Sequence, residues 1–144
     1  MARLPGSVLF ACTLNSIRSP MAASLLRQLH GGHIYIDSVG VRTAPVDPFA
    51  VSVMAEIGID LKAHQPKSFD ELEDTSFDLV VSLSPDAQHS AVELTRTTAC
   101  EVEFWPIFDA TAVEGNREEI LTAYRMVRDQ LRKRIAERFP TAPQ

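Results

Sequence analysis

The sequence predicts an α/β fold in three layers, with helices on both faces of a four-stranded parallel sheet. Along the 144 residues, short apolar runs alternate with segments whose apolar residues recur at helical spacing. This repeated β-α order favours a parallel sheet with right-handed crossovers. Hydrophobic residues make up 45% and charged residues 23% of the chain, which excludes a disordered or collagen-like protein. No linker interrupts the order, so we expect one domain over residues 1–144.

The first half of the chain contains two predicted strands and two predicted helices. Residues 7–11 form an apolar run typical of a strand buried on both faces. A helix over residues 19–30 stops at the glycine pair that follows it, and residues 34–36 predict a second strand, closed by a turn over residues 37–40. The next helix ends at Gly58. The apolar residues expected to face the core are Met21, Ala22, Leu25, Leu26 and Leu29 in the first helix, and Phe49, Val53, Met54 and Ile57 in the second.

The second half repeats the pattern. Residues 77–83 are rich in β-branched residues and predict the third strand, and residues 102–105 predict the fourth. Between them, Pro85 and Asp86 open a helix. The last helix carries apolar residues every three to four positions. Its apolar face comprises Ile120, Tyr124, Val127, Leu131 and Ile135. We expect its basic residues, Arg125, Arg128, Arg132 and Lys133, to form a solvated face paired with Glu118, Glu119 and Asp129.

Charge and cysteine content exclude several classes of protein. A formal net charge of −5 argues against nucleic acid as the main partner. No apolar run approaches the ~20 residues of a membrane span, and no signal peptide is evident, so we expect a cytoplasmic protein without a membrane partner. The two cysteines, Cys12 and Cys100, do not make a disulfide framework. In a reducing compartment each is expected to be a free thiol.

The loop after the first strand is the leading candidate for a functional site. Ligands of such sheets bind beyond the carboxyl ends of the strands. Here a buried strand ends at Cys12, and Arg18 opens the first helix. A short loop at a helix N-terminus directs several backbone amides at one centre, and an arginine adds a planar fork for two oxygens of a tetrahedral oxyanion. The same field favours the thiolate form of Cys12, a nucleophile that needs no metal or cofactor.

Blander interpretations of these residues also exist. Free cysteine is usually a small buried core residue, and Arg18 alone is an ordinary charge at a helix start. His30 and His33 lie close in sequence, but no Cys or His pairs stand at zinc-finger spacing. A turn at the helix end explains both histidines, so no metal site is expected. The combination of strand, loop, arginine, serine and helix favours chemistry at Cys12.

Residues 8–22, Val-Leu-Phe-Ala-Cys-Thr-Leu-Asn-Ser-Ile-Arg-Ser-Pro-Met-Ala, resemble the signature of the low-molecular-weight protein-tyrosine phosphatase superfamily, which includes thioredoxin-coupled arsenate reductases. The resemblance extends over nearly the whole chain. It includes residues 37–40, 56–60 and 77–81, His64, and an acidic loop near Asp109. It implies a phosphatase I-like, flavodoxin-like fold with strand order 2-1-3-4.

The resemblance also implies roles for individual residues. Cys12 would attack phosphorus to form a phosphocysteine, Arg18 would bind the equatorial oxygens, and Ser19 would steady the thiolate. Asn15 would adopt an unusual backbone conformation, supported by Ser38 and His64. Asp109 matches the general acid, with Glu114 a weaker candidate. The substrate-binding loop would comprise Thr13, Leu14, Asn15, Ser16, Ile17, Arg18 and Ser19.

Three departures from the family pattern bear on activity. Leu14 stands where glycine is common, which questions how tightly the loop closes. Ala110 replaces the usual proline after the acid, so that loop should be less rigid. The aromatic residues that flank the pocket in eukaryotic-type members are absent from residues 41–43 and 110–112. Phosphotyrosine would therefore have fewer stacking partners, unless Phe108, Phe49 or Trp105 substitutes.

Three functions remain open. The first is a cysteine-dependent phosphomonoester hydrolase of the protein-tyrosine phosphatase type, acting on a phosphorylated protein or a small phosphomonoester. The second is an arsenate reductase on the same loop. Because the two further cysteines of thioredoxin-coupled members are replaced by serines after the third strand, it would need an external small thiol. The third is a non-catalytic phosphate-binding module. We expect a monomer or weak dimer.

Overall fold

The computed structural model describes residues 4–141, and its strands and helices alternate as the sequence predicts. The four strands form one parallel sheet in the order β2-β1-β3-β4, which confirms the predicted fold class and strand order. Along the chain the elements are β1 (Ser7–Cys12), α1 (Arg18–His30), β2 (Tyr35–Gly40), α2 (Pro48–Ala55), β3 (Leu79–Ser82), α3 (Pro85–Leu94), β4 (Glu101–Phe104) and α4 (Arg117–Arg138). Two short 3-10 helices, η1 (Phe69–Glu71) and η2 (Ala110–Ala112), lie in the connections.

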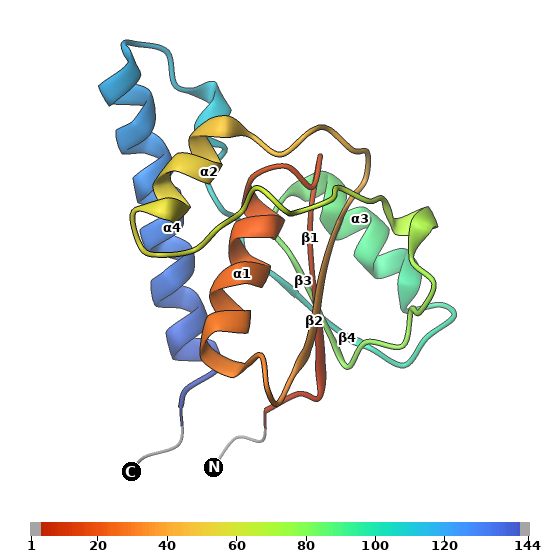
Figure 1. Ribbon diagram of the computed structural model, residues 1–144. Coiled ribbons are helices and arrows are strands. Elements are labelled where there is room, and N and C mark those ends of the chain that lie inside the picture. Colours follow the sequence, from red (N-terminus) through yellow and green to blue (C-terminus); the bar gives the residue numbers. More distant parts are fainter. Residues whose placement is uncertain (1–3, 142–144) are drawn as a thin grey trace.

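Helices cover both faces of the sheet. In Figure 1, α1 and α4 lie on one side of the strands and α3 on the other. The central strand β1 explains why, because its side chains alternate between the two faces. Val8 and Phe10 enter the larger core under α1, α2 and α4, whereas Leu9 and Ala11 enter the smaller core under α3. All four side chains are fully buried, as the continuous apolar run predicts.

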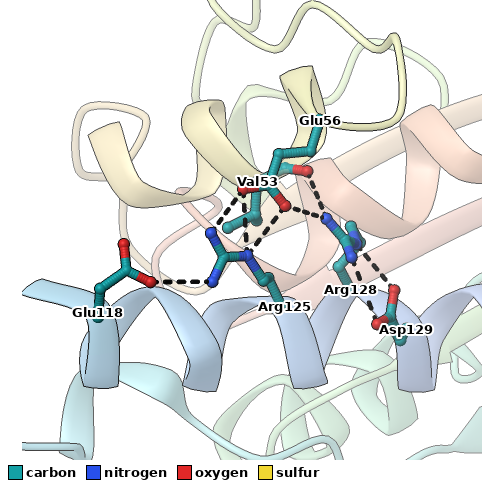
Figure 2. Close-up of polar contacts among 6 residues, drawn as sticks. All are labelled: Val53, Glu56, Glu118, Arg125, Arg128 and Asp129. Atoms are coloured by element: carbon teal, nitrogen blue, oxygen red, sulfur yellow. Dashed lines mark hydrogen bonds and ion pairs between the residues drawn. The ribbon is translucent and has the colours of Figure 1, made fainter.

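The last helix is tied to the end of α2 by a network of ion pairs, drawn in Figure 2. Arg125 and Arg128 both contact the carboxylate of Glu56, each at 2.8 Å, and their hydrogen bonds lower the pKa of Glu56 to about 2. Arg128 also donates to the carbonyl of Val53 at 2.9 Å. Arg128 is only 9% exposed, so the prediction that it lies on the solvated face is wrong. The carbonyl and Glu56 compensate for its burial. Arg125 pairs with Glu118 as expected.

Three of the differences from the sequence predictions have a structural explanation. Residues 37–40 are not a turn: they continue β2 and pair with residues 9–12 of β1, because the central strand requires a partner along its whole length. Helix α2 ends at Ala55, before the positive φ of Gly58. Leu29 is 40% exposed because it lies at the margin of the α1–α4 contact, beside Arg132.

Among the helices of residues 4–141, none has both the length and the apolar character that crossing a membrane requires.

Candidate active site

The loop over residues 12–18 joins the carboxyl end of β1 to the start of α1, and four of its carbonyl groups accept hydrogen bonds from residues 41–47. The backbone amides of Val41, Arg42 and Ala44 donate to the carbonyls of residues 12, 13 and 14 at 3.1, 2.9 and 3.1 Å. Asp47 donates to the carbonyl of Ser16 at 3.0 Å. Within residues 4–141, no backbone amide of residues 13–17 donates to another backbone carbonyl. These amides are therefore available to an anion at the helix N-terminus.

The sulfur of Cys12 lies at the base of this loop. The residue as a whole is 2% exposed. Its partner is the hydroxyl of Ser19, 2.9 Å away. That hydroxyl has a second possible acceptor, the carbonyl of Val39 at 3.2 Å. Because a serine hydroxyl donates only one hydrogen, it donates to the sulfur when Cys12 is a thiolate and to Val39 when Cys12 is a thiol. The arrangement accommodates both protonation states of the sulfur.

Asn15 holds the loop in shape from within. Its φ of 54° is the only positive value among the described non-glycine residues, a conformation that asparagine tolerates. Its side-chain nitrogen donates to the hydroxyls of Ser19 at 2.8 Å and Ser38 at 3.0 Å. Its side-chain oxygen accepts from the amide of Lys67 at 2.9 Å. The fully buried amide is thus satisfied at both ends, and Ser38 is one of its partners.

His64 contacts the same asparagine from the loop that follows α2. Its Nε2 lies 3.0 Å from the backbone carbonyl of Asn15 and 3.1 Å from the side-chain oxygen. Both atoms are acceptors, so Nε2 carries a proton and donates. Burial holds the pKa of His64 below its ordinary value of 6.5, although the Asn15 carbonyl opposes this effect. The neutral imidazole with hydrogen on Nε2 is the form that fits.

Gly40 has a packing role that the sequence did not reveal. A Cβ at this position would lie 2.7 Å from the amide nitrogen of Asn15 and 2.8 Å from the carbonyl carbon of Leu14, and it would also collide with the carbonyl of Arg42. Only glycine permits β2 to approach the loop this closely. In the sequence, Gly40 was the end of an expected turn and part of the resemblance over residues 37–40, and neither predicts this close contact.

Arg18 lies at the mouth of the loop and is partly exposed. Its Nη1 donates to the carbonyl of Ile107 at 3.1 Å and, more weakly, to that of Leu83 at 3.4 Å. These carbonyls follow β4 and β3, so the ends of two strands orient the guanidinium. A pocket of about 270 Å³ lies above the sulfur and includes Cys12, Arg18 and residues 13, 14, 16 and 17 in its lining. The pocket therefore places the thiol of Cys12 beside a guanidinium, a group that can bind two oxygens of an oxyanion.

Asp109 reaches the same pocket from the loop after β4. Its Oδ1 accepts from the backbone amide and the hydroxyl of Thr111, at 3.0 and 2.6 Å. Partial burial raises the pKa of Asp109, but the two bonds from Thr111 and the charge of Arg18 outweigh it and hold the pKa below its ordinary value of 3.8. Asp109 is thus ionised near neutral pH. Glu114 does not line the pocket.

A second carboxylate in the pocket, Asp47, has a structural role that sequence reasoning missed. Its Oδ1 caps α2 through the amide of Phe49 at 2.8 Å, and its Oδ2 accepts from the hydroxyl of Tyr124 at 3.0 Å. Burial and this carboxylate raise the pKa of Tyr124, so the hydroxyl remains protonated. With both oxygens occupied, Asp47 is poorly placed to exchange protons with a ligand. The available signal was Asp before Pro at a helix start.

The pocket lining contains no aromatic side chain. Trp105 is buried, with its ring centroid 6.1 Å from that of Phe10. Phe49 packs against Tyr124 at 5.4 Å, and Phe108 is exposed but does not line the pocket. None of the three substitutes for the missing aromatic residues. Loop closure, in contrast, is compatible with Leu14, because that residue does not require a positive φ.

The second cysteine lies far from the first. Cys12 lies at the carboxyl end of β1, whereas Cys100 immediately precedes the amino end of β4. Because the strands are parallel, the two cysteines lie at opposite ends of the strands. The register separates them by about five residues along the strands, roughly 16 Å, whereas a disulfide requires Cα atoms within about 7 Å. The two thiols therefore cannot pair without unfolding the sheet.

The structure offers no metal centre in its described part. Within residues 4–141, no three His, Cys, Asp or Glu side chains form a group that could hold a metal ion. His30 instead lies 2.7 Å, through Nε2, from the carbonyl oxygen of Phe139 at the end of α4.

Comparisons with a family model, with related sequences and with solved structures agree on one family. Residues 7–138 match the model of the low molecular weight phosphotyrosine protein phosphatase family. The chain is 35% identical over 129 residues to an arsenate reductase from Halalkalibacterium halodurans, covering 89% of this chain and 91% of that protein. A solved arsenate reductase in its oxidized state superimposes with a TM-score of 0.75 at 28% identity, covering 92% and 95% of the two chains. A tyrosine phosphatase from Erwinia amylovora has a TM-score of 0.72 at 19% identity, covering 96% and 95%, and shows the shared fold.

Proposed function

The chain belongs to the low molecular weight phosphotyrosine protein phosphatase family, and from that premise we propose that it reduces arsenate at Cys12 with an external thiol. The sequence alone ranked phosphomonoester hydrolysis first and arsenate reduction second. The similarity to arsenate reductases favours the reverse order. The observation that carries the proposal is the small pocket over Cys12, because it lacks any aromatic lining for an aryl ester. A tetrahedral oxyanion needs only the loop amides and Arg18.

The reaction begins with the Cys12 thiolate attacking arsenic, while one hydroxyl of arsenate takes up a proton from solvent and leaves as water. The product is a sulfur–arsenic(V) adduct. An external thiol then attacks the Cys12 sulfur, and the electron pair of the S–As bond passes to arsenic, which leaves as arsenite. This step joins Cys12 to the reductant in a mixed disulfide. A second thiol resolves it, so two thiols are oxidised to one disulfide for each arsenate reduced.

The reductant must come from outside the chain because the internal relay is missing. Cys100 lies at the amino end of the strands, whereas Cys12 lies at their carboxyl end. After β3, where the resemblance implies relay cysteines, the chain has Ser84, whose hydroxyl accepts from Thr13 at 3.1 Å and caps α3. A hydroxyl cannot form a disulfide, so the mixed disulfide on Cys12 is resolved by a second molecule.

Phosphomonoester hydrolysis is a second candidate, favoured specifically by Asp109. This carboxylate shares the pocket with Cys12, and the hydrogen bonds from Thr111 leave its Oδ2 for a leaving group or a water. Cys12 would form a phosphocysteine, and Asp109 would then deprotonate the attacking water. In the first step, the protonated form of Asp109 would donate a proton to the leaving oxygen. Its lowered pKa favours the ionised form, which is the form that accepts the proton of the water.

A side-by-side assay of the purified protein tests both candidates. We expect arsenate reduction with a glutathione-type thiol, abolished in Cys12→Ser and retained in Cys100→Ser, the matched control. Thioredoxin in place of the small thiol should support less turnover, because the reduced sulfur is buried. Hydrolysis of p-nitrophenyl phosphate without arsenate reduction by any thiol would overturn the proposal in favour of the second candidate. Oxyanion binding without either reaction would indicate a non-catalytic module.

A further inference from the structure

We propose that the side chain of Leu14 limits the size of the ligand, so that the pocket favours an inorganic oxyanion over an aryl-substituted one. The inference rests on the proposed function, because it concerns the same site. Leu14 lines the pocket above Cys12 and is 37% exposed. Together with Ala44 and Pro45, it supplies an apolar part of the lining.

Leu14 has little freedom to move aside. Its carbonyl accepts from the amide of Ala44 at 3.1 Å, and its carbonyl carbon is so close to Gly40 that a Cβ there would approach to 2.8 Å. The next residue, Asn15, is buried and hydrogen-bonded to Ser38 in β2 and to His64 and Lys67 in the loop after α2. The backbone that carries the leucine is therefore fixed, and only side-chain rotation remains.

The dimensions of the pocket agree with this role. Its volume of about 270 Å³ is below the roughly 300–1,000 Å³ typical of pockets for organic ligands. An arsenate bound by the loop amides and Arg18 would share the pocket with the side chain of Leu14. A ring attached to the same tetrahedral group would have to extend past Leu14, without an aromatic partner in the lining. In an apolar pocket, even one methylene changes discrimination by about 10-fold or more.

A binding experiment with matched ligands tests the inference. Arsenate and phenylarsonate share the tetrahedral head and differ by one ring, so the ratio of their dissociation constants reports size discrimination. We would measure both by calorimetry in a Cys12→Ser background, where no covalent adduct with sulfur forms. The variants are Leu14→Ala, which removes the obstruction, Leu14→Met, which conserves its volume, and Leu29→Ala. Leu29 is similarly exposed, at 40%, but does not line this pocket.

We expect arsenate to bind more tightly than phenylarsonate in the Cys12→Ser parent. Leu14→Ala should lower this preference about 10-fold, while Leu14→Met and Leu29→Ala retain it. An unchanged preference in a folded Leu14→Ala variant, or an equal loss in Leu29→Ala, would overturn the inference. Failure of every variant to bind arsenate would overturn the proposed function as well. Binding with the expected preferences, but no reduction by the wild-type protein, would reject the function and leave the size limit standing.

Discussion

The hydroxyl of Ser19 lies 2.9 Å from the sulfur of Cys12, and this distance connects the start of α1 to the candidate nucleophile. The hydroxyl oxygen also accepts from the side chain of Asn15 at 2.8 Å. The hydrogen of the Ser19 hydroxyl is therefore directed toward either the sulfur or the carbonyl of Val39. Loop shape and sulfur chemistry therefore depend on the same hydroxyl group.

Replacing Ser19 by alanine should slow the reaction at Cys12. The thiolate loses a donor at 2.9 Å, and a hydrogen bond to a charged group contributes roughly 1.5–3 kcal/mol, so we expect turnover to fall about 10-fold or more. The rate of Cys12 alkylation by iodoacetamide should fall as well, because the same donor is lost. Ser24→Ala, on the same helix, is the control. Equal alkylation rates for Ser19→Ala and wild type would contradict this role.

Asp109→Asn should affect phosphomonoester hydrolysis according to the leaving group. Loss of a general acid–base residue costs roughly 100-fold or more for a poorly leaving alkyl alcohol and less for p-nitrophenol, which needs little protonation. Turnover of both esters should be compared with that of Glu114→Gln, whose carboxylate lies outside the pocket lining. A uniform loss across leaving groups would assign the proton transfer to another residue.

Gly40→Ala should destabilise the protein and distort the loop. The new methyl group would lie 2.7 Å from the amide nitrogen of Asn15, and overpacking of this kind costs about 1–3 kcal/mol. Urea denaturation should show a lower free energy of unfolding, and vanadate should bind more weakly. Gly32→Ala is the matched control, because a Cβ there meets no atom within 4 Å. If both variants are equally stable, β2 and the loop are less closely packed than the structure shows.

His64 should make stability fall as the pH is lowered below neutral. Its pKa in the folded protein lies below 6.5, so the unfolded chain binds more protons just below that pH. The free energy of unfolding therefore falls from about pH 7.5 to about pH 5. His64→Gln keeps a donor for Asn15 but does not titrate, so its stability should depend less on pH. Chemical denaturation at both pH values checks this, with the exposed His89→Gln as the control. A slope in His64→Gln as steep as in wild type would contradict the prediction.

Most strands and helices could be predicted from the spacing of apolar residues, because this spacing depends only on residues close together in the chain. The apolar run of β1 and the spacing of Val127, Leu131 and Ile135 in α4 each predict their element without knowledge of the neighbours. Arg128 and residues 37–40 were misplaced for the opposite reason. Arg128 is buried because the end of α2 offers it a carbonyl and a carboxylate, and residues 37–40 form a strand because β1 lies beside them.

The sequence by itself determined the parallel α/β architecture and the loop from Cys12 to Arg18, since both depend on residues close together in the chain. Only the tertiary structure decided which distant groups surround the sulfur. Gly40 permits the close approach of β2 to the loop, and Asp47 connects the loop to α4. The register of the sheet places Cys100 at the opposite end of the strands from Cys12. These relationships join residues separated by tens of positions, and they arise only when the sheet is assembled and packed.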